Sequence, residues 1–385
     1  MGRGQNLLNL VKKIKQEKQI EEIKTEITEV IKPENLKAGV IAFGIDGTFT
    51  SDATATASDI ALGKTAYVKG EKITGNLEVG DYNAELDTSI TKAFSVQNCI
   101  TKIGKLDTSN CTSITFRDCL FLEEIPEIDI SKLTNTNSMF YNCQKIKTIP
   151  LINTNKITNM SFMFYYCNNL ESIPLIDTSN VTIMDSMFYH CNKLESIPQL
   201  ITSKCTNMNS MFYNCTNLKG IPQLDTSNAT NTNGMFYHCD NLITAPSIDI
   251  SKVTDAGSMF GQCVSLSSVP EYDVSSLYRL GSIFYNCRNL TNLGGFVNLG
   301  KGYTIQAENN SNQALDLSYS PLLTHESLMN VINNLYDLNL TYNVANGGTL
   351  YKQKLKLGST NLAKLTAEEI AIATNKGWTV KEKYN

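Results

Sequence analysis

Residues 181–204 read VTIMDSMFYHCNKLESIPQLITSK, and variants of this 24-residue unit follow one another from about Leu86 to Gly300. Cysteine marks the period most clearly, because eight cysteines are each 24 residues apart: Cys119, Cys143, Cys167, Cys191, Cys215, Cys239, Cys263 and Cys287. Proline keeps the same period, at Pro126, Pro150, Pro174, Pro198, Pro222, Pro246 and Pro270. A fixed period of this length is typical of a solenoid, in which each unit forms one coil and stacks on the next.

Each unit combines a Met-Phe-x-x-Cys stretch, an Ile-Pro stretch and a turn. Its apolar residues are mostly three apart, which is too wide for a single long strand. This spacing predicts a short helical turn or 3₁₀ segment at Met-Phe-x-x-Cys, a bend, and a short extended piece around Ile-Pro. Turn formers such as Asp177-Thr178-Ser179-Asn180 then close the coil.

No unit can bury its apolar residues alone, so equivalent side chains of stacked units must form ladders through the core. About eight rungs at roughly 5 Å each give a rod about 40 Å long. Eleven cysteines cannot all pair within the chain, and stacked cysteines suit a disulfide poorly, so we expect small buried thiols. The predicted phenylalanine ladder is Phe116, Phe140, Phe164, Phe188, Phe212, Phe236, Phe260 and Phe284.

The repeated Met-Phe-Tyr-x-Cys-x-x-Leu-x-x-Ile-Pro and Asp-Thr-Ser-x-Val-Thr sequences resemble the BspA-type leucine-rich repeat of bacterial surface and phage proteins. The resemblance covers more than half of the chain, and it implies an α/β-type leucine-rich repeat solenoid of 24-residue units over residues 86–300. The first unit departs from the pattern, because Cys99 and Cys119 are 20 residues apart and Thr115 replaces the methionine. Terminal repeats are expected to be atypical.

Residues 1–32 predict a helix that docks the chain on other proteins or joins copies of the chain. Ile20, Ile23, Ile27 and Val30 follow a 3-4-3 spacing, and isoleucine at both seam positions favours three or four strands over two. We therefore expect a homo-oligomer, with a trimer favoured. An amphipathic helix packed against its own chain or a neighbour is an equally good interpretation.

Residues 33–85 are rich in Gly, Thr and Ala and predict a small β module of two hairpins. One hairpin turns at Asp46-Gly47 and the other, within residues 65–77, at Lys69-Gly70. Parts of residues 36–75 resemble a module of phage tail and other virion proteins, which implies that the region binds other virion proteins. The residues by themselves indicate only a spacer that shields the first coil.

Residues 301–385 predict two strand–helix units that close the solenoid. Thr324 is a candidate N-cap for the first helix, and Thr366 with Glu369 forms a candidate capping box for the second. Gly377 is placed to end the second helix. This ending resembles the carboxyl end of phage-encoded repeat proteins.

Composition limits the partners of the chain. A net charge of −4 argues for neither nucleic acid nor a membrane surface, and no apolar run approaches the 18 residues of a membrane-inserted helix. The apolar cluster of residues 7–11 is interrupted by Asn9 and followed by lysines, so we expect no signal peptide. On this basis the chain stays in the cytoplasm of the cell that makes it, unless an assembly carries it out.

No constellation of residues points to catalysis. His190 and His238 occupy equivalent positions two units apart, roughly 10 Å from each other, which is too far for one shared zinc ion without unusual side-chain reach. No Ser-His-Asp, HExxH, P-loop or GxGxxG pattern occurs at a meaningful spacing. We therefore expect no enzyme activity, no metal and no cofactor.

The candidate binding surface consists of positions that vary between units, because a position that tolerates Glu, Leu, Gln and Ser in one rod does not belong to the core. Solenoids offer such rows as an extended surface, although a merely solvated face is an equally good interpretation. A row of tyrosines beside the core has two further interpretations, half-buried spacers, which we favour, or a strip on which sugars stack. The candidate residues are Glu123, Glu127, Lys147, Glu171, Glu195, Gln199, Lys219, Gln223 and Glu271.

Two binding functions follow from these observations. The first is a structural component of a phage or phage-like virion, assembled in the host cytoplasm, in which a tail, baseplate or head fibre presents the solenoid to a host-surface polysaccharide or protein. The alternative is a bacterial BspA-like cell-surface adhesin. The missing export signal and cell-wall anchor count against the alternative.

Overall fold

The computed structural model describes residues 65–68, 71–74, 80–82, 93–95, 100–103, 108–301, 314–340, 342–345, 347 and 352–382. The predicted docking helix with Ile20, Ile23, Ile27 and Val30, and the hairpin predicted at Asp46-Gly47, lie outside these residues. The chain divides into two compact units, Met1–Tyr82 and Asn83–Asn385.

In the first unit, β1 (Thr65–Val68) and β2 (Glu71–Thr74) pair antiparallel, with Val68 opposite Glu71. The register leaves the two residues Lys69 and Gly70 between the strands, which confirms the hairpin predicted there. The strand β3 (Gly80–Tyr82) follows.

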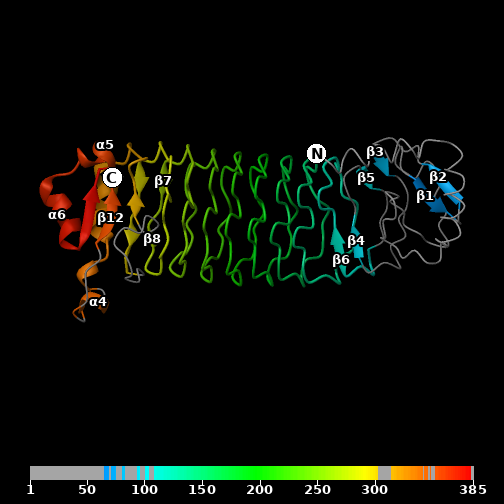
Figure 1. Ribbon diagram of the computed structural model, residues 1–385, viewed down its shortest axis with the longest axis horizontal. Coiled ribbons are helices and arrows are strands. Elements are labelled where there is room, and N and C mark those ends of the chain that lie inside the picture. The colour runs from blue at the N-terminus through cyan, green and yellow to red at the C-terminus, as the bar shows by residue number, and fades with distance from the viewer. Residues whose placement is uncertain are drawn as a thin grey trace, which may run out of the picture. The chain divides into compact units, whose positions relative to one another are not determined.

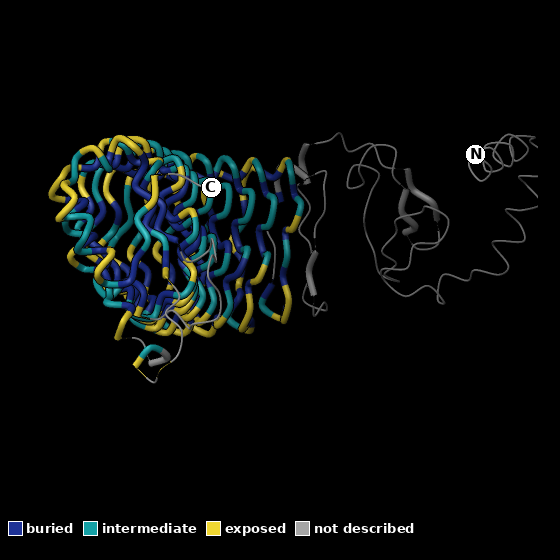
Figure 2. The backbone as a smooth tube through the Cα atoms, turned by 60° about the vertical axis from the view of Figure 1, so that its left-hand side comes forward, coloured by how far each residue is buried: buried dark blue, intermediate teal, exposed yellow. Residues whose placement is uncertain are grey.

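The second unit is a solenoid of parallel coils stacked along one axis (Figure 1). Parallel bridges join equivalent residues of successive coils, from Asn135 with Asn159 to Asp255 with Arg279. Buried and exposed segments recur at the same place in successive coils, as Figure 2 shows. The 24-residue period therefore corresponds to one coil, as predicted.

The Met-Phe-x-x-Cys stretch forms a chain of overlapping turns and not the predicted helical turn or 3₁₀ segment. Alternate N–H groups donate hydrogen bonds to the next coil. Those of Ser138 and Phe140 donate to its carbonyl groups at 3.0 and 2.9 Å. The N–H groups between them, such as that of Met139, donate back three residues within the coil. A helix needs consecutive internal hydrogen bonds, so this pattern excludes one. Within residues 108–301 the solenoid has turns and short strands only, and its predicted α/β-type character is wrong there.

The spacing of three that suggested a helix has another origin. Ser138 and Asn142 have φ angles of 57° and 59°, and equivalent residues of the other coils repeat these left-handed values. A left-handed residue cannot continue a right-handed helix, so the chain forms successive turns without closing helical hydrogen bonds.

The phenylalanine ladder is confirmed. All eight predicted side chains are fully buried, and ring centroids of neighbouring coils lie between 5.4 and 6.0 Å apart in stacked pairs. Phe212, for example, stacks on Phe188 at 5.5 Å and on Phe236 at 5.6 Å. Contacts between stacked aromatic rings stabilise a core beyond the area that they bury.

The repeated cysteines are buried, as predicted, and they have a role that the sequence did not reveal. The Cys191 Sγ donates to the carbonyl of Phe164 at 3.2 Å, and the Cys215 Sγ donates to the carbonyl of Phe188 at 3.1 Å. Burial raises the pKa of both thiols. Each thiol therefore satisfies a backbone carbonyl between coils while it fills the core.

The extended pieces around the prolines form short parallel strands where the solenoid approaches its carboxyl end. β7 (Ser268–Val269) pairs with β9 (Asn292–Leu293), and β8 (Tyr272–Asp273) pairs with β10 (Phe296–Val297). Near the first coil, β4 (Ala93–Ser95) pairs in parallel with β6 (Ser113–Thr115), and β5 (Ile100–Ile103) lies between them in sequence.

The carboxyl-terminal residues form a three-stranded parallel sheet and helices, with one strand, β13, beyond the two strand–helix units that the sequence predicts. The sheet has the order β11 (Leu315–Asp316), β12 (Gln353–Lys356), β13 (Trp378–Lys381). The helices are α3 (His325–Asn334), η4 (Leu338–Leu340), α4 (Tyr342–Ala345), α5 (Gly358–Leu362) and α6 (Ala367–Asn375).

Both predicted helix starts are confirmed. The Thr324 side chain accepts a hydrogen bond from the Ser327 N–H, and Thr366 with Glu369 forms a complete capping box. Gly377, with a φ of 84°, follows the last residues of α6 as the predicted helix stop.

Candidate binding surface

Three rows of side chains project from the extended pieces around the prolines, and we call this surface the proline face. It includes all nine candidate residues, each of which is exposed. The first row is Glu123, Lys147, Glu171, Glu195, Lys219, Ile243 and Ser267, and the second is Glu127, Leu151, Leu175, Gln199, Gln223, Ser247 and Glu271. The third row, two residues after the second, is Asp129, Asn153, Asp177, Ile201, Asp225, Asp249 and Asp273.

The core fixes the direction of these side chains. Leu194, Ile197 and Leu200 are buried, and the residues between them, such as Glu195 and Gln199, are exposed. Residues two apart in an extended segment point to the same side, so the second and third rows share one surface. The role of the nine residues in binding stays a prediction.

Some side chains of the proline face contact the next coil. Lys219 Nζ lies 2.7 Å from Glu195 Oε2, and Gln199 Nε2 donates to the Gln223 carbonyl at 2.7 Å. Because both partners of the ion pair are more than half exposed, it contributes only about 0.2–1 kcal/mol to stability. These contacts orient the side chains of the rows, but they contribute little to the stability of the stacked coils.

Two open hollows lie along the proline face. One, of about 680 Å³, is lined by residues that include Glu123, Lys147 and Asn169. The other, of about 800 Å³, spans three coils and is lined by residues that include Gln199, Ile201 and Asp225. Their linings mix amides, carboxylates and aliphatic carbons, which suits a polar partner that also carries apolar groups.

The sequence interpretation assigned the third row to turns and missed its place in this surface. The Asp177 Oδ1 accepts a hydrogen bond from the Ser179 N–H at 2.9 Å, and Asp225 caps Ser227 in the same way at 3.1 Å. Hydrogen bonds from the serine hydroxyl and N–H lower the pKa of both aspartates. The sequence could have indicated this place, because each third-row residue comes two positions after a second-row residue, and residues two apart in an extended segment point to the same side.

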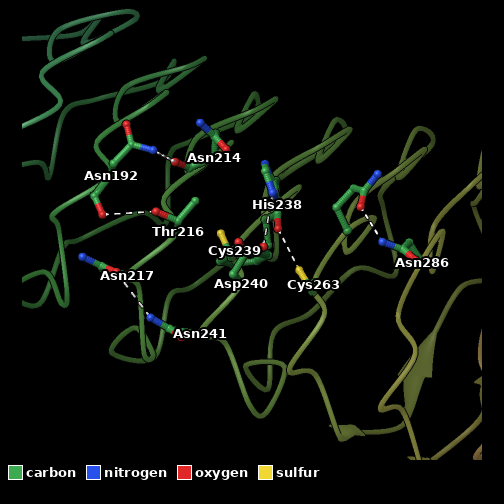
Figure 3. Close-up of polar contacts among 12 residues, drawn as sticks. Asn192, Asn214, Thr216, Asn217, His238, Cys239, Asp240, Asn241, Cys263 and Asn286 are labelled. Carbon is green, nitrogen blue, oxygen red and sulfur yellow. Dashed lines mark hydrogen bonds and ion pairs between the residues drawn. The ribbon is translucent and has the colours of Figure 1, made fainter.

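A separate column with His190 and His238 has a structural explanation. All eight members have φ angles between 57° and 63°, a left-handed conformation that Asn, Asp and His adopt more readily than most residues. Figure 3 shows Asn214, His238 and Asn286 of this column at equivalent places on different coils. The members are Asp118, Asn142, Tyr166, His190, Asn214, His238, Gln262 and Asn286.

Local contacts occupy both histidines of this column. The His190 Nδ1 lies 2.7 Å from the Asn214 Nδ2, and burial lowers the pKa of His190. The His238 Nε2 lies 3.4 Å from the Asp240 Oδ1. No group of three metal-ligating side chains is brought together among the residues that the structure describes.

The tyrosine row is a continuous stack. Rings of Tyr141, Tyr165, Tyr189, Tyr213 and Tyr237 follow one another with centroids 4.5 to 4.7 Å apart. The guanidinium of Arg117 covers the Tyr141 ring at 4.1 Å. Because the ring faces pack against each other, sugars have only ring edges to contact, which favours the interpretation of these residues as half-buried spacers. Within the described residues no helix is long and apolar enough to cross a membrane.

Three solved structures of bacterial leucine-rich repeat proteins are similar to this chain. A leucine-rich repeat protein of T. pallidum is 17% identical over 55% of this chain and 84% of that chain, with a TM-score of 0.28. One from Eubacterium ventriosum is 16% identical over 62% and 86%, with a TM-score of 0.25. A leucine rich cell surface protein from Faecalibacterium prausnitzii is 13% identical over 70% and 87%, with a TM-score of 0.24.

Curated proteins give no match to the chain. Residues 65–165, 145–246 and 206–301 each match the family described as "Mycoplasma protein of unknown function, DUF285". Together these stretches span residues 65–301, more than half of the 385 residues. The chain therefore belongs to the DUF285 family.

Proposed function

We propose that this chain is a non-catalytic binding protein that attaches to a partner at a cell surface through its proline face, as an adhesin does. The observation that carries the proposal is the contrast between core and surface. Beneath the face, phenylalanine and cysteine repeat in every coil, whereas the first and second rows change from Glu to Leu, Gln, Lys or Ser. A rigid scaffold with a varied row of exposed side chains is the arrangement by which solenoids bind.

The virion hypothesis has less support. It depends on a resemblance within residues 36–75, and most of these lie outside the described residues. The family description and the similar solved structures name no phage. An adhesin-like role needs only the solenoid surface, so it is the proposal that we develop.

Replacing Glu171, Glu195 and Gln223 together with alanine is expected to weaken attachment about tenfold. Three exposed contacts of about 0.5 kcal/mol each give a change of this size. The free energy of unfolding should fall by no more than about 1 kcal/mol, because all three side chains are exposed and the Glu195–Lys219 ion pair is weak. Binding of the purified chain to a glycan array and to a panel of extracellular-matrix proteins measures the effect.

A matched control replaces Thr158, Thr182 and Thr206, exposed residues on another segment of the coil, with serine. This variant should bind like the unaltered chain. If the alanine variant attaches as well as the control, or if the unaltered chain binds nothing in either panel, the proposed function is wrong.

Deleting residues 1–32 is expected to leave the solenoid folded and to abolish self-association. The predicted helix carries the seam of Ile20, Ile23, Ile27 and Val30, whereas the solenoid buries its own core. Sedimentation of the full and truncated chains distinguishes the outcomes. A truncated chain with the same oligomeric state would show that this segment does not join the copies.

A further inference from the structure

Four large apolar side chains are exposed on the polar proline face: Ile243 in the first row, and three others that lie on successive coils. Leu151, Leu175 and Ile201 are 75%, 66% and 51% exposed, and we call them the apolar stripe. The Glu171 N–H donates to the Lys147 carbonyl at 2.8 Å, which joins the coils of Leu151 and Leu175. The Ile201 N–H donates to the Thr178 Oγ1 at 2.8 Å, which joins the next pair of coils. The three side chains therefore stand on three adjacent coils.

Ile201 gives up a hydrogen bond that every other member of the third row makes. The other six members, all Asp or Asn, accept the N–H of the residue two positions later at 2.8 to 3.2 Å. Isoleucine has no acceptor, and half of its side chain faces solvent. Compared with Asp or Asn, isoleucine at this position lacks the hydrogen bond of the turn and exposes apolar surface, so it does not stabilise the fold. A residue that departs from the repeat without stabilising the fold is typical of a binding position.

Carboxylates outnumber lysines in the three rows that contain the apolar stripe. The three rows contain ten of them, and only two lysines, Lys147 and Lys219. Lys219 is already paired with Glu195. Beside Ile201 the hollow of about 800 Å³ extends to Asp225 and Asp249 and can accept a long side chain. The carboxylates are Glu123, Glu127, Asp129, Glu171, Asp177, Glu195, Asp225, Asp249, Glu271 and Asp273.

We propose that the partner is a protein segment in which large apolar side chains contact the apolar stripe and lysine or arginine side chains contact the carboxylates of the three rows. This inference rests on the proposed function and specifies its partner. A partner that covers exposed aliphatic side chains removes apolar surface from water, which favours binding, and complementary charge steers and orients the complex.

A polysaccharide fits this surface less well. Sugars stack on exposed aromatic ring faces, and none of the three rows contains an aromatic residue. The tyrosines of the neighbouring stack cover each other's faces. Aliphatic carbon beside exposed carboxylates is the complement of a cationic, amphipathic polypeptide.

The test uses the full chain with Leu151→Gln, Leu175→Gln and Ile201→Asp, which introduces residues that other coils carry in the same rows. Short random peptides are selected on the immobilised unaltered chain. We expect the selected peptides to combine Leu, Ile or Phe with Lys or Arg, and to bind the variant at least tenfold more weakly. Their affinity should also fall as ionic strength rises.

A stability measurement makes the test independent of misfolding. Ile201→Asp supplies the missing acceptor to the Ser203 N–H, so the variant should melt at the same temperature as the unaltered chain or higher. Selected peptides without the cationic and apolar pattern, or equal binding to the variant, would overturn the inference. A glycan that binds the unaltered chain but not the variant would overturn it in favour of a polysaccharide.

The alanine variant of Glu171, Glu195 and Gln223 separates this inference from the proposed function. If that variant loses attachment while the variant of the apolar stripe retains it, the proline face binds but the stripe is not its anchor. In that case the proposed function stands and the present inference fails.

Discussion

Replacing Phe212 with alanine is expected to lower the free energy of unfolding by about 3–5 kcal/mol, the range observed for a fully buried phenylalanine. Phe212 is inaccessible to solvent and stacks on Phe188 and Phe236. Its removal leaves a cavity in the core between two stacked rings. Because stacked repeats depend on nearest-neighbour contacts, the loss also weakens the connection between the two halves of the array.

Unfolding in urea followed by circular dichroism measures this effect, and a broadened or divided transition would report the weakened connection. Phe121→Ala is the matched control, because Phe121 is 45% exposed and its truncation should change stability by less than about 0.5 kcal/mol. Equal costs for the two substitutions would contradict the assignment of the phenylalanine ladder to the core.

The period and the core of this fold can be predicted from the sequence. Once the units stack, a residue that recurs in every unit contacts its equivalent in the next coil. Phe140 and Phe164 had to meet once their units were stacked, and their rings do stack at 5.6 Å. Thr324 and Thr366 were readable for a similar reason, since a helix start depends on a few neighbouring residues. Such local and periodic rules need no knowledge of the rest of the chain.

The conformation within each coil was not readable, because an apolar spacing of three fits both a helix and a run of turns. In the run of turns, alternate N–H groups donate to carbonyl groups of the next coil, whereas in a helix they would donate within the same segment. Even the left-handed positions are obscured by exceptions such as Phe162, with a φ of 56° where other coils have Ser or Gly. The residue at one position does not by itself predict a left-handed conformation. The residues at the equivalent positions of all the coils have to be compared.

The exposure of the candidate binding residues was predictable from the sequence, whereas their role in binding stays a prediction. Variation between units placed Glu123 and Glu127 outside the core correctly, because core positions cannot tolerate such changes. Ile201 was not identified, since in sequence it is only an apolar residue near a turn. Its significance depends on the hydrogen bond that Asp177 and Asp225 make and that isoleucine cannot make.

Replacing Asn214 with valine is expected to lower the free energy of unfolding by about 1–3 kcal/mol, the cost of forcing a β-branched residue into the left-handed region. Asn214 has a φ of 59°, and its N–H donates to the Tyr237 carbonyl of the next coil at 2.7 Å. That hydrogen bond holds the backbone in place, so the chain cannot relax without separating the coils. Asn214→Gly should cost less, because glycine adopts this conformation without strain.

The comparison of the two substitutions isolates backbone strain from the side-chain contact. Both remove the contact between the Asn214 Nδ2 and the His190 Nδ1 at 2.7 Å. Their difference therefore reports the strain of the left-handed conformation, reduced by the larger entropy that glycine loses on folding. Urea unfolding of both variants beside the unaltered chain gives this difference. If valine and glycine cost the same, the contact with His190 explains the asparagine. If valine costs more, the column of Asp, Asn, Tyr, His and Gln exists because each coil needs a left-handed residue there, and the two histidines need no chemical function to account for their position.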